Sequence, residues 1–270
     1  MLMSPQNLPE RLGEVRERIK KAAEAARRPV DSITLLGITK GQPASMLQAA
    51  VQAGMREFGE SYLQEALDKM AVLAKLRAQV QPPQSTIGDD RAASEGGRTV
   101  SEGIPSGGTD LTWHFVGRLQ SNKTRPVAEG FAWAHAIDRL KIAERLAEQR
   151  PYYAPPLNVC LQVNVAGEDS KGGVSLAELP ALATRVASLP RLKLRGLMCL
   201  PPEESDPARQ RHWFRLLREA LEQLNASGFT LDTLSMGMSG DLEAAIQEGS
   251  TLVRVGTALF GPRDAAQPAP

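Results

Sequence analysis

The chain contains few of the residues that build disulfide scaffolds and metal sites. Its 270 residues include 2 cysteines and 3 histidines. Cys160 and Cys199 lie in separate apolar runs, without the short spacing of a zinc or redox motif. We therefore expect two buried, reduced thiols. Histidine, cysteine and carboxylate residues also form no cluster at metal-ligand spacing, so we expect no metal site.

An excess of one charge and a long apolar run are also missing. Lys and Arg total 32 against 31 Asp and Glu, which gives no electrostatic reason to expect nucleic acid or an acidic membrane as a partner. No apolar run approaches the roughly 20 residues that span a bilayer. Residues 1–29 lack the uninterrupted apolar core of a signal peptide. We expect a soluble, cytoplasmic monomer.

A regular alternation of strand and helix patterns runs through the chain. An amphipathic helix comes first, with Leu8, Leu12, Val15, Ile19, Ala22 and Ala26 on one face. Eight strand-like runs follow, each with a helix or helical turn after it, at 32–39, 56–59, 111–117, 131–137, 157–165, 192–200, 231–237 and 251–256. Such repeating units predict parallel strands.

The number of units favours a closed barrel over an open sheet. An open doubly wound sheet usually carries a glycine-rich phosphate turn after its first strand, whereas the first strand here is followed by "TKGQPAS". Without the insertion described below, roughly 240 residues remain, close to the ~250 of a (β/α)8 barrel. The sequence predicts an α/β protein, a single (β/α)8 TIM barrel with an extra N-terminal helix, as one domain over residues 1–270.

Residues 81–110 interrupt this alternation. The segment is rich in proline, glycine, serine and charge and poor in large apolar residues. It cannot bury enough surface to offset the entropy of ordering it. We expect a disordered surface insertion, because the alternation resumes afterwards; a lid or a docking loop is the functional alternative.

The candidate site lies at the carboxyl ends of the strands, where barrel enzymes place their chemistry. Lys40 ends the first strand, and its amine can face a cleft there. The loops after the seventh and eighth strands are the usual phosphate site. Ser239 and Thr257 offer hydroxyls at helix starts, and Gly256 lets the backbone approach a ligand. Arg254 is placed to point toward the barrel mouth.

An amine facing a phosphate cup suggests one phosphorylated aldehyde held between them. Pyridoxal 5'-phosphate (PLP) fits, because a lysine forms a Schiff base with it and a polar side chain meets its ring nitrogen. Each feature alone has an ordinary explanation: Lys40 as a solvated loop charge, and "GMSGD" as a helix cap. Lys171 in "GEDSKGGV" is a second candidate amine, in a glycine-rich loop.

Other residues near the strand ends are candidates for the pocket. Asn164 and Met198 end the fifth and sixth strands, and Met238 lies in the loop after the seventh. His114 ends the third strand, either as a packed histidine or as a base. His135 and His212 are expected to be structural.

Six segments resemble a known family. They read "LLGITK", "FGESYLQEA", "WHFVGRLQSNK", "LQVNVAGEDSKGGV", "LRGLMCLP" and "LSMGMSGDLEAAIQEGSTLVRVGTALFG". With these motifs the chain resembles the PLP homeostasis proteins, also called the YggS/PROSC family of PLP-binding proteins. The resemblance covers nearly the whole chain except the insertion.

The resemblance implies a barrel like the N-terminal domain of alanine racemase, with PLP on Lys40. It implies phosphate contacts from Ser239, Gly256 and Thr257, and it places Arg254 at the pyridine nitrogen. It also implies a protein that buffers PLP or delivers it to apo PLP-dependent enzymes without robust turnover. The family usually has asparagine where this chain has Ser61, so Ser61 is a pocket candidate with a shorter side chain.

Two enzyme readings stand as alternatives. The first is a PLP-dependent amino-acid racemase; racemases of this fold add a β-domain that supplies a tyrosine base, whereas "LFGPR" here is followed by "DAAQPAP". An arginine at the pyridine nitrogen also disfavours ring protonation, which leaves weak side activity at most. The second is a barrel enzyme that uses Lys40 on a sugar phosphate.

Overall fold

The computed structural model describes residues 5–80, 111–168 and 171–262. The expected insertion at 81–110 lies outside the described residues. Its disorder, and the assignment of residues 1–270 to one domain, therefore stay predictions.

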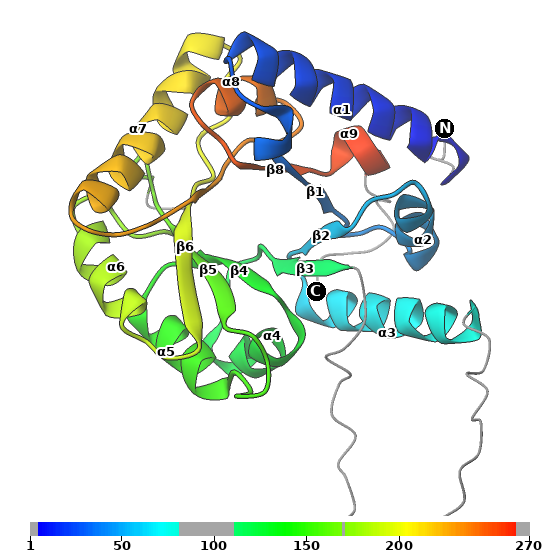
Figure 1. Ribbon diagram of the computed structural model, residues 1–270, viewed down its shortest axis with the longest axis horizontal. Helices are drawn as coiled ribbons and strands as arrows, with labels where there is room; N and C mark the ends of the chain where they lie inside the picture. The colour runs from blue at the N-terminus through cyan, green and yellow to red at the C-terminus, as the bar shows by residue number, and fades with distance from the viewer. Residues whose placement is uncertain (1–4, 81–110, 169–170, 263–270) are drawn as a thin grey trace, which may run out of the picture.

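Eight parallel strands form a closed barrel at the centre of the molecule (Figure 1). The barrel closes because β1 pairs with β8, for example Leu35 with Val253. The predicted (β/α)8 fold and all eight strands are thus confirmed. The strands are β1 Thr34–Ile38, β2 Glu57–Glu60, β3 Thr112–Phe115, β4 Trp133–Ile137, β5 Leu157–Gln162, β6 Leu192–Met198, β7 Thr233–Ser235 and β8 Leu252–Val255.

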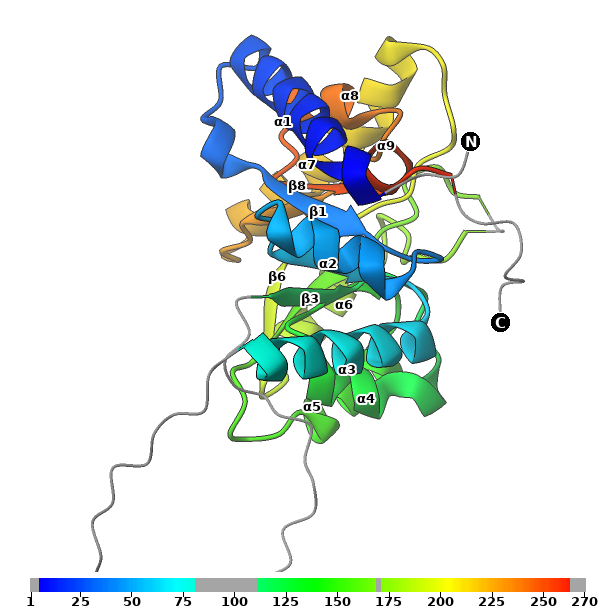
Figure 2. The same cartoon turned by 90° about the vertical axis from the view of Figure 1, so that its right-hand side faces the viewer.

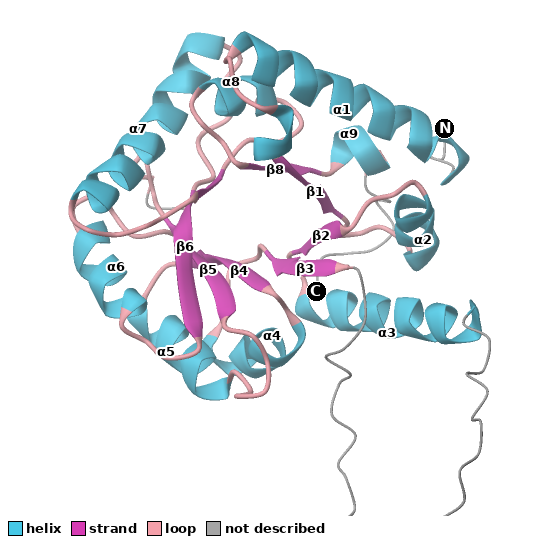
Figure 3. Ribbon diagram, in the orientation of Figure 1, coloured by secondary structure: helices cyan, strands magenta, loops and turns pink. Residues whose placement is uncertain are grey.

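Helices surround this barrel (Figure 3). Those that follow the strands are α2 Ala44–Gln52, α3 Leu63–Val80, α4 Thr124–Gly130, α5 Leu140–Gln149, α6 Leu179–Ala187, α7 Pro207–Ala226, α8 Leu242–Gln247 and α9 Thr257–Phe260. Three short 3-10 turns lie at Pro5–Asn7, Val30–Ser32 and Ser121–Lys123. Every helix in the described part of the chain is too short or too polar to cross a membrane.

The extra N-terminal helix, α1 (Leu8–Ala25), packs over α8 and α9 (Figure 2). Its predicted apolar face is buried through Leu8, Leu12, Val15 and Ile19. Amphipathic helices are held to a barrel by burial of such a stripe. The helix therefore covers the part of the molecule that carries the loops after β7 and β8.

Most of the apolar core lies between the sheet and the helices. Phe58, Phe131, Phe214 and Phe260 are among its largest fully buried side chains. A separate small cluster of Ala136, Cys160, Met198 and Trp133 comes from β4, β5 and β6. The two cysteines are buried and unpaired, and burial raises the pKa of each thiol to about 12. The expectation that both thiols are buried is confirmed.

Candidate functional site

A cavity of about 350 Å³ opens at the carboxyl ends of the strands. Its volume falls in the range of roughly 300–1,000 Å³ that ligand pockets occupy. Eight of the residues predicted from the sequence line it: Lys40, Ser61, Met198, Met238, Ser239, Arg254, Gly256 and Thr257. Most of the residues that line this cavity are therefore predictable from the sequence, although the strands that carry them are far apart in the chain.

Lys40 follows β1 in a tight turn that is held on both sides. The amide of Thr39 donates to the carbonyl of Gly59, and the amide of Gln42 donates to the carbonyl of Thr39. Gly41 has φ 69°, a left-handed conformation that glycine adopts at low cost. The turn thus fixes where the lysine side chain leaves the backbone.

A buried charged cluster supports this turn from the outer side of the barrel. Lys69 of α3 donates 2.6 Å hydrogen bonds to Glu60 and Glu65, and another to the carbonyl of Thr39. Glu65 also accepts from the amide of Gly41 at 2.6 Å. Burial raises the pKa of Glu60, and the ammonium of Lys69 opposes that rise. The cluster holds both residues that flank Lys40.

The sequence alone does not predict this cluster. Glu65 and Lys69 stand four residues apart on α3, which is the spacing of a helical ion pair. Such pairs are usually solvated, so the spacing alone gives no reason to place this one behind Lys40. What marks it is burial, since Glu60 is 0% exposed and Lys69 is 5% exposed.

Arg254 carries a buried positive charge to the wall of the cavity. Its Nη1 donates to the carbonyl of Ser235 and, at 2.8 Å, to the Ser235 hydroxyl; its Nη2 donates to the carbonyl of Cys199 at 2.8 Å. These acceptors are neutral, and no carboxylate pairs with Arg254 in the described ranges. Burial lowers the pKa of the guanidinium. A desolvated cation of this kind is stabilised by an electron-rich group on a ligand.

The loops after β7 and β8 meet at the other side of the cavity. The hydroxyl of Ser239 accepts from the amide of Ala258 at 3.3 Å, which joins the β7 loop to the start of α9. Arg18 of α1 donates to the carbonyl of Ser239 at 2.9 Å and pairs with Glu243 at 2.6 Å. The N-terminal helix therefore holds the loop in which Ser239 lies.

Two of the predicted pocket residues do not line the cavity. Asn164 donates its side-chain amide to the carbonyl of Glu168 at 2.8 Å, so it shapes its own loop. His114 lies within β3 rather than at its tip, and its ring turns toward Glu57 and His135. Lys171, the alternative amine, pairs with Glu168 at 3.0 Å and is also outside the lining.

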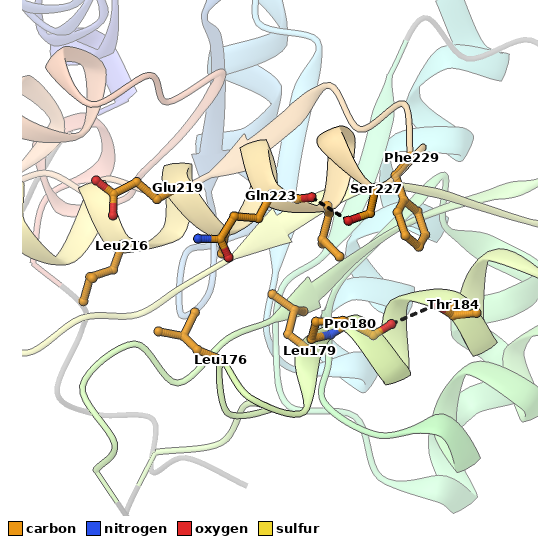
Figure 4. Close-up of a pocket in the computed structure, with 11 residues that line it drawn as sticks. Leu176, Leu179, Pro180, Thr184, Leu216, Glu219, Gln223, Ser227 and Phe229 are labelled. Atoms are coloured by element: carbon orange, nitrogen blue, oxygen red, sulfur yellow. Dashed lines mark hydrogen bonds between the residues drawn. The ribbon is translucent and has the colours of Figure 1, made fainter.

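A second cavity, of about 400 Å³, lies between α6 and α7 (Figure 4). Leucines and Phe229 form much of its wall. Two of its polar side chains bond to their own helices: Ser227 donates to the carbonyl of Gln223, and Thr184 to the carbonyl of Pro180. Because these hydroxyls are satisfied locally, this groove offers less specific polar chemistry than the cavity at Lys40.

No group of three or more histidine, cysteine or carboxylate residues that could hold a metal ion occurs in the part of the chain that the structure covers. The donors at the Lys40 cavity are instead an amine, hydroxyls and a guanidinium. This set suits an organic anion that also carries an electrophilic carbon.

The chain matches the family model of the alanine racemase N-terminal domain over residues 11–264. It is 50% identical, over 96% of its length and 97% of the relative's, to a pyridoxal phosphate homeostasis protein of Pseudomonas aeruginosa. It is also similar to the solved structure of PipY of Synechococcus elongatus with PLP bound. That match has a TM-score of 0.72 and 32% identity, covering 94% of this chain and 100% of PipY.

Alanine racemases are more distant. The alanine racemase of Corynebacterium glutamicum matches with a TM-score of 0.60 and 14% identity, over 97% of this chain and 63% of the racemase. A likeness at this identity concerns the barrel fold.

Proposed function

This chain belongs to the family of pyridoxal phosphate homeostasis proteins, and from that premise we propose that it binds PLP in the cavity at Lys40. The observation that carries the proposal is the arrangement of three groups around one cavity. Lys40 enters from β1, the buried guanidinium of Arg254 from β8, and the hydroxyl of Ser239 from the β7 loop. We further propose that the protein buffers PLP or delivers it.

The donor set fits each part of PLP. The Nε–H of Arg254 has no acceptor among the described residues, and a ring nitrogen with a lone pair would provide one. Ser239, Thr257 and the backbone at Gly256 offer hydroxyl and amide groups for a phosphate. When bound, PLP supplies an aldehyde that condenses reversibly with a primary amine.

Each residue then has a defined task. Lys40 presents its amine from a turn that Lys69 and Glu65 fix in place. Ser239 and Thr257 bind the phosphate, and Met198 and Met238 give the ring an apolar wall. Ser61, which follows β2, also lines the cavity, where its short hydroxyl leaves more space than an amide would.

A carrier role follows from Arg254. A guanidinium is a donor that stays protonated, so it favours a ring nitrogen that accepts a hydrogen bond rather than one that carries a proton. An unprotonated ring is a weaker electron sink. Arg254 therefore favours storage of PLP over robust turnover, with weak side activity at most.

Transfer of PLP to another protein tests the proposed carrier role. The PLP-loaded protein should restore activity to an apo PLP-dependent enzyme, while incubation with amino acids of both enantiomeric series should give no more racemisation, decarboxylation or transamination than free PLP. Robust turnover of any one amino acid would favour the racemase-like enzyme instead. Gel filtration and cell fractionation would test the expected monomeric state and cytoplasmic location.

A further inference from the structure

Four polar side chains cross the inside of the barrel in one line. His114 Nε2 lies 2.7 Å from Glu57 Oε2, and His114 Nδ1 lies 2.9 Å from His135 Nε2. His135 Nδ1 then lies 2.8 Å from the hydroxyl of Ser235. We call Glu57, His114, His135 and Ser235 the interior chain. It ends at Arg254, whose Nη1 donates to the same hydroxyl at 2.8 Å.

The interior chain has to pass through the barrel rather than around it. His135 is on β4 and Ser235 is on β7, and these strands are separated by β5 and β6 in the closed sheet. A hydrogen bond between them can form only across the enclosed space. The interior chain therefore connects Glu57 on β2 with Arg254 in the wall of the Lys40 cavity.

The donors in the interior chain all point the same way. Arg254 only donates and the Glu57 carboxylate only accepts. We assign the Ser235 hydroxyl as the donor to His135, so that His135 donates to His114 and His114 to Glu57. In this order each imidazole donates through Nε2 and accepts through Nδ1, so both are neutral. Burial lowers the pKa of both rings, in agreement with this assignment.

We propose that the interior chain positions the guanidinium of Arg254 against the ring nitrogen of PLP. This inference rests on the proposed function. Ser235 fixes Arg254 twice, through its carbonyl and its hydroxyl, and the hydroxyl is oriented by His135. Hydrogen bonds in a row of this kind polarise one another. The histidines touch no ligand; they act through Arg254, as positioning residues.

Two ligands that differ only at the ring nitrogen distinguish a loss of Arg254 positioning from a general loss of stability. The test compares PLP with its 1-deaza analogue, in which CH replaces the ring nitrogen, for binding to the full chain. Ser235→Ala removes the hydroxyl from the interior chain. We expect it to weaken PLP binding about tenfold and to change binding of the deaza analogue less than twofold. Equal losses for both ligands would overturn the proposal.

Ser250→Ala is the matched control. Ser250 is also 0% exposed, and its hydroxyl donates to carbonyls of the neighbouring strands outside the interior chain. It should leave the ratio of the two affinities unchanged. A wild-type protein that binds neither ligand would refute the proposed function itself, which is a distinct result.

A second measurement needs no ligand and no substitution. Nitrogen-15 NMR of the wild-type protein without PLP reports which imidazole nitrogen carries the proton. His114 and His135 should both be neutral and protonated at Nε2. A proton on Nδ1 of either ring would break the one-way order of donors and overturn the proposal, even if Ser235→Ala did not fold.

Discussion

The inside of the barrel and the layer between barrel and helices are built from different residues. The outer layer is filled by aromatic and aliphatic side chains such as Phe58, Phe131 and Leu146. The inside holds Arg254 and two histidines, which are also buried. Burying polar groups costs free energy unless they are hydrogen-bonded. The outer layer therefore stabilises the fold, whereas the interior is arranged for a ligand.

The largest expected effect is a loss of stability when a buried ring is removed from the outer layer. Phe214→Ala on α7 removes a fully buried ring and should lower the free energy of unfolding by about 3–5 kcal/mol. PLP affinity of the folded fraction should stay at the wild-type value, because Phe214 lies outside the cavity lining. Urea unfolding measures the first and titration with PLP the second.

Glu219→Ala is the control for that variant, since Glu219 is exposed on the same helix. Its unfolding curve should match the wild type. A Phe214→Ala protein that folds normally but loses PLP affinity would contradict the claim that the outer layer stabilises the fold and the interior serves the ligand.

The next prediction concerns Lys69 and Glu60, a buried ion pair in the otherwise apolar outer layer. Lys69→Met leaves Glu60 buried without its cation and should cost about 3–5 kcal/mol at pH 8. The folded-state pKa of Glu60 is raised above its unfolded value, so the folded state holds the proton more tightly. The loss should therefore shrink as pH falls toward the unfolded pKa, about 4.5.

Urea unfolding of Lys69→Met at several pH values measures this. The double variant Glu60→Gln/Lys69→Met should recover much of the stability and lose the added pH dependence, since no fully buried carboxylate is left without its cation. Glu65 also loses Lys69, but its side chain is 24% exposed and still accepts from the amide of Gly41. A loss of the same size at every pH would mean that Glu60 is not the source.

A smaller effect tests the phosphate side of the cavity. Ser239→Ala and Thr257→Val each remove one hydroxyl, and hydrogen bonds to a charged group contribute roughly 1.5–3 kcal/mol. PLP affinity should fall about 10- to 100-fold for each. Pyridoxal, which lacks the phosphate, serves as the control ligand and should bind nearly as before. Equal losses for the two ligands would show that these residues do not bind the phosphate.

The smallest expected effect is a pH dependence of stability caused by the two buried histidines of the interior. Burial lowers the folded-state pKa of His114 and His135 below the unfolded value, so the unfolded chain takes up protons that the folded chain refuses. Stability is then fully present above about pH 6.5 and falls as pH decreases, by up to about 1.4 kcal/mol per pH unit for each ring. His135→Gln should reduce this slope.

The slope is read from urea unfolding between pH 5 and 8. His212→Gln, which changes an exposed histidine on α7, is the control and should keep the wild-type slope. If His135→Gln also kept that slope, His135 would not be the neutral ring that the interior chain requires.

The sequence predicted most of the fold because each unit of the barrel repeats the same local pattern. An apolar run such as "LNVCLQ" predicts a strand, and strand ends in a parallel barrel meet at one face. The sequence therefore predicts that one site contains Lys40, Arg254 and Ser239, although it shows no contact between them.

The interior chain could not be predicted in this way. His135 and Ser235 are 100 residues apart, and their contact depends on how the closed barrel brings opposite strands together. The position of His114 near a strand end predicts that it lines the cavity, but the pleat directs its ring toward His135 instead. Local patterns give the side of a strand and not its partner across the barrel.

The measurement that tests the account most directly is the site of covalent capture. The protein is loaded with PLP, reduced with borohydride, digested and mapped by mass spectrometry. The pyridoxyl group should lie on Lys40, and Lys40→Ala should lose both this label and the visible absorbance of the bound cofactor. A label found mainly on Lys171, or retained in full by Lys40→Ala, would contradict the assignment of the cavity.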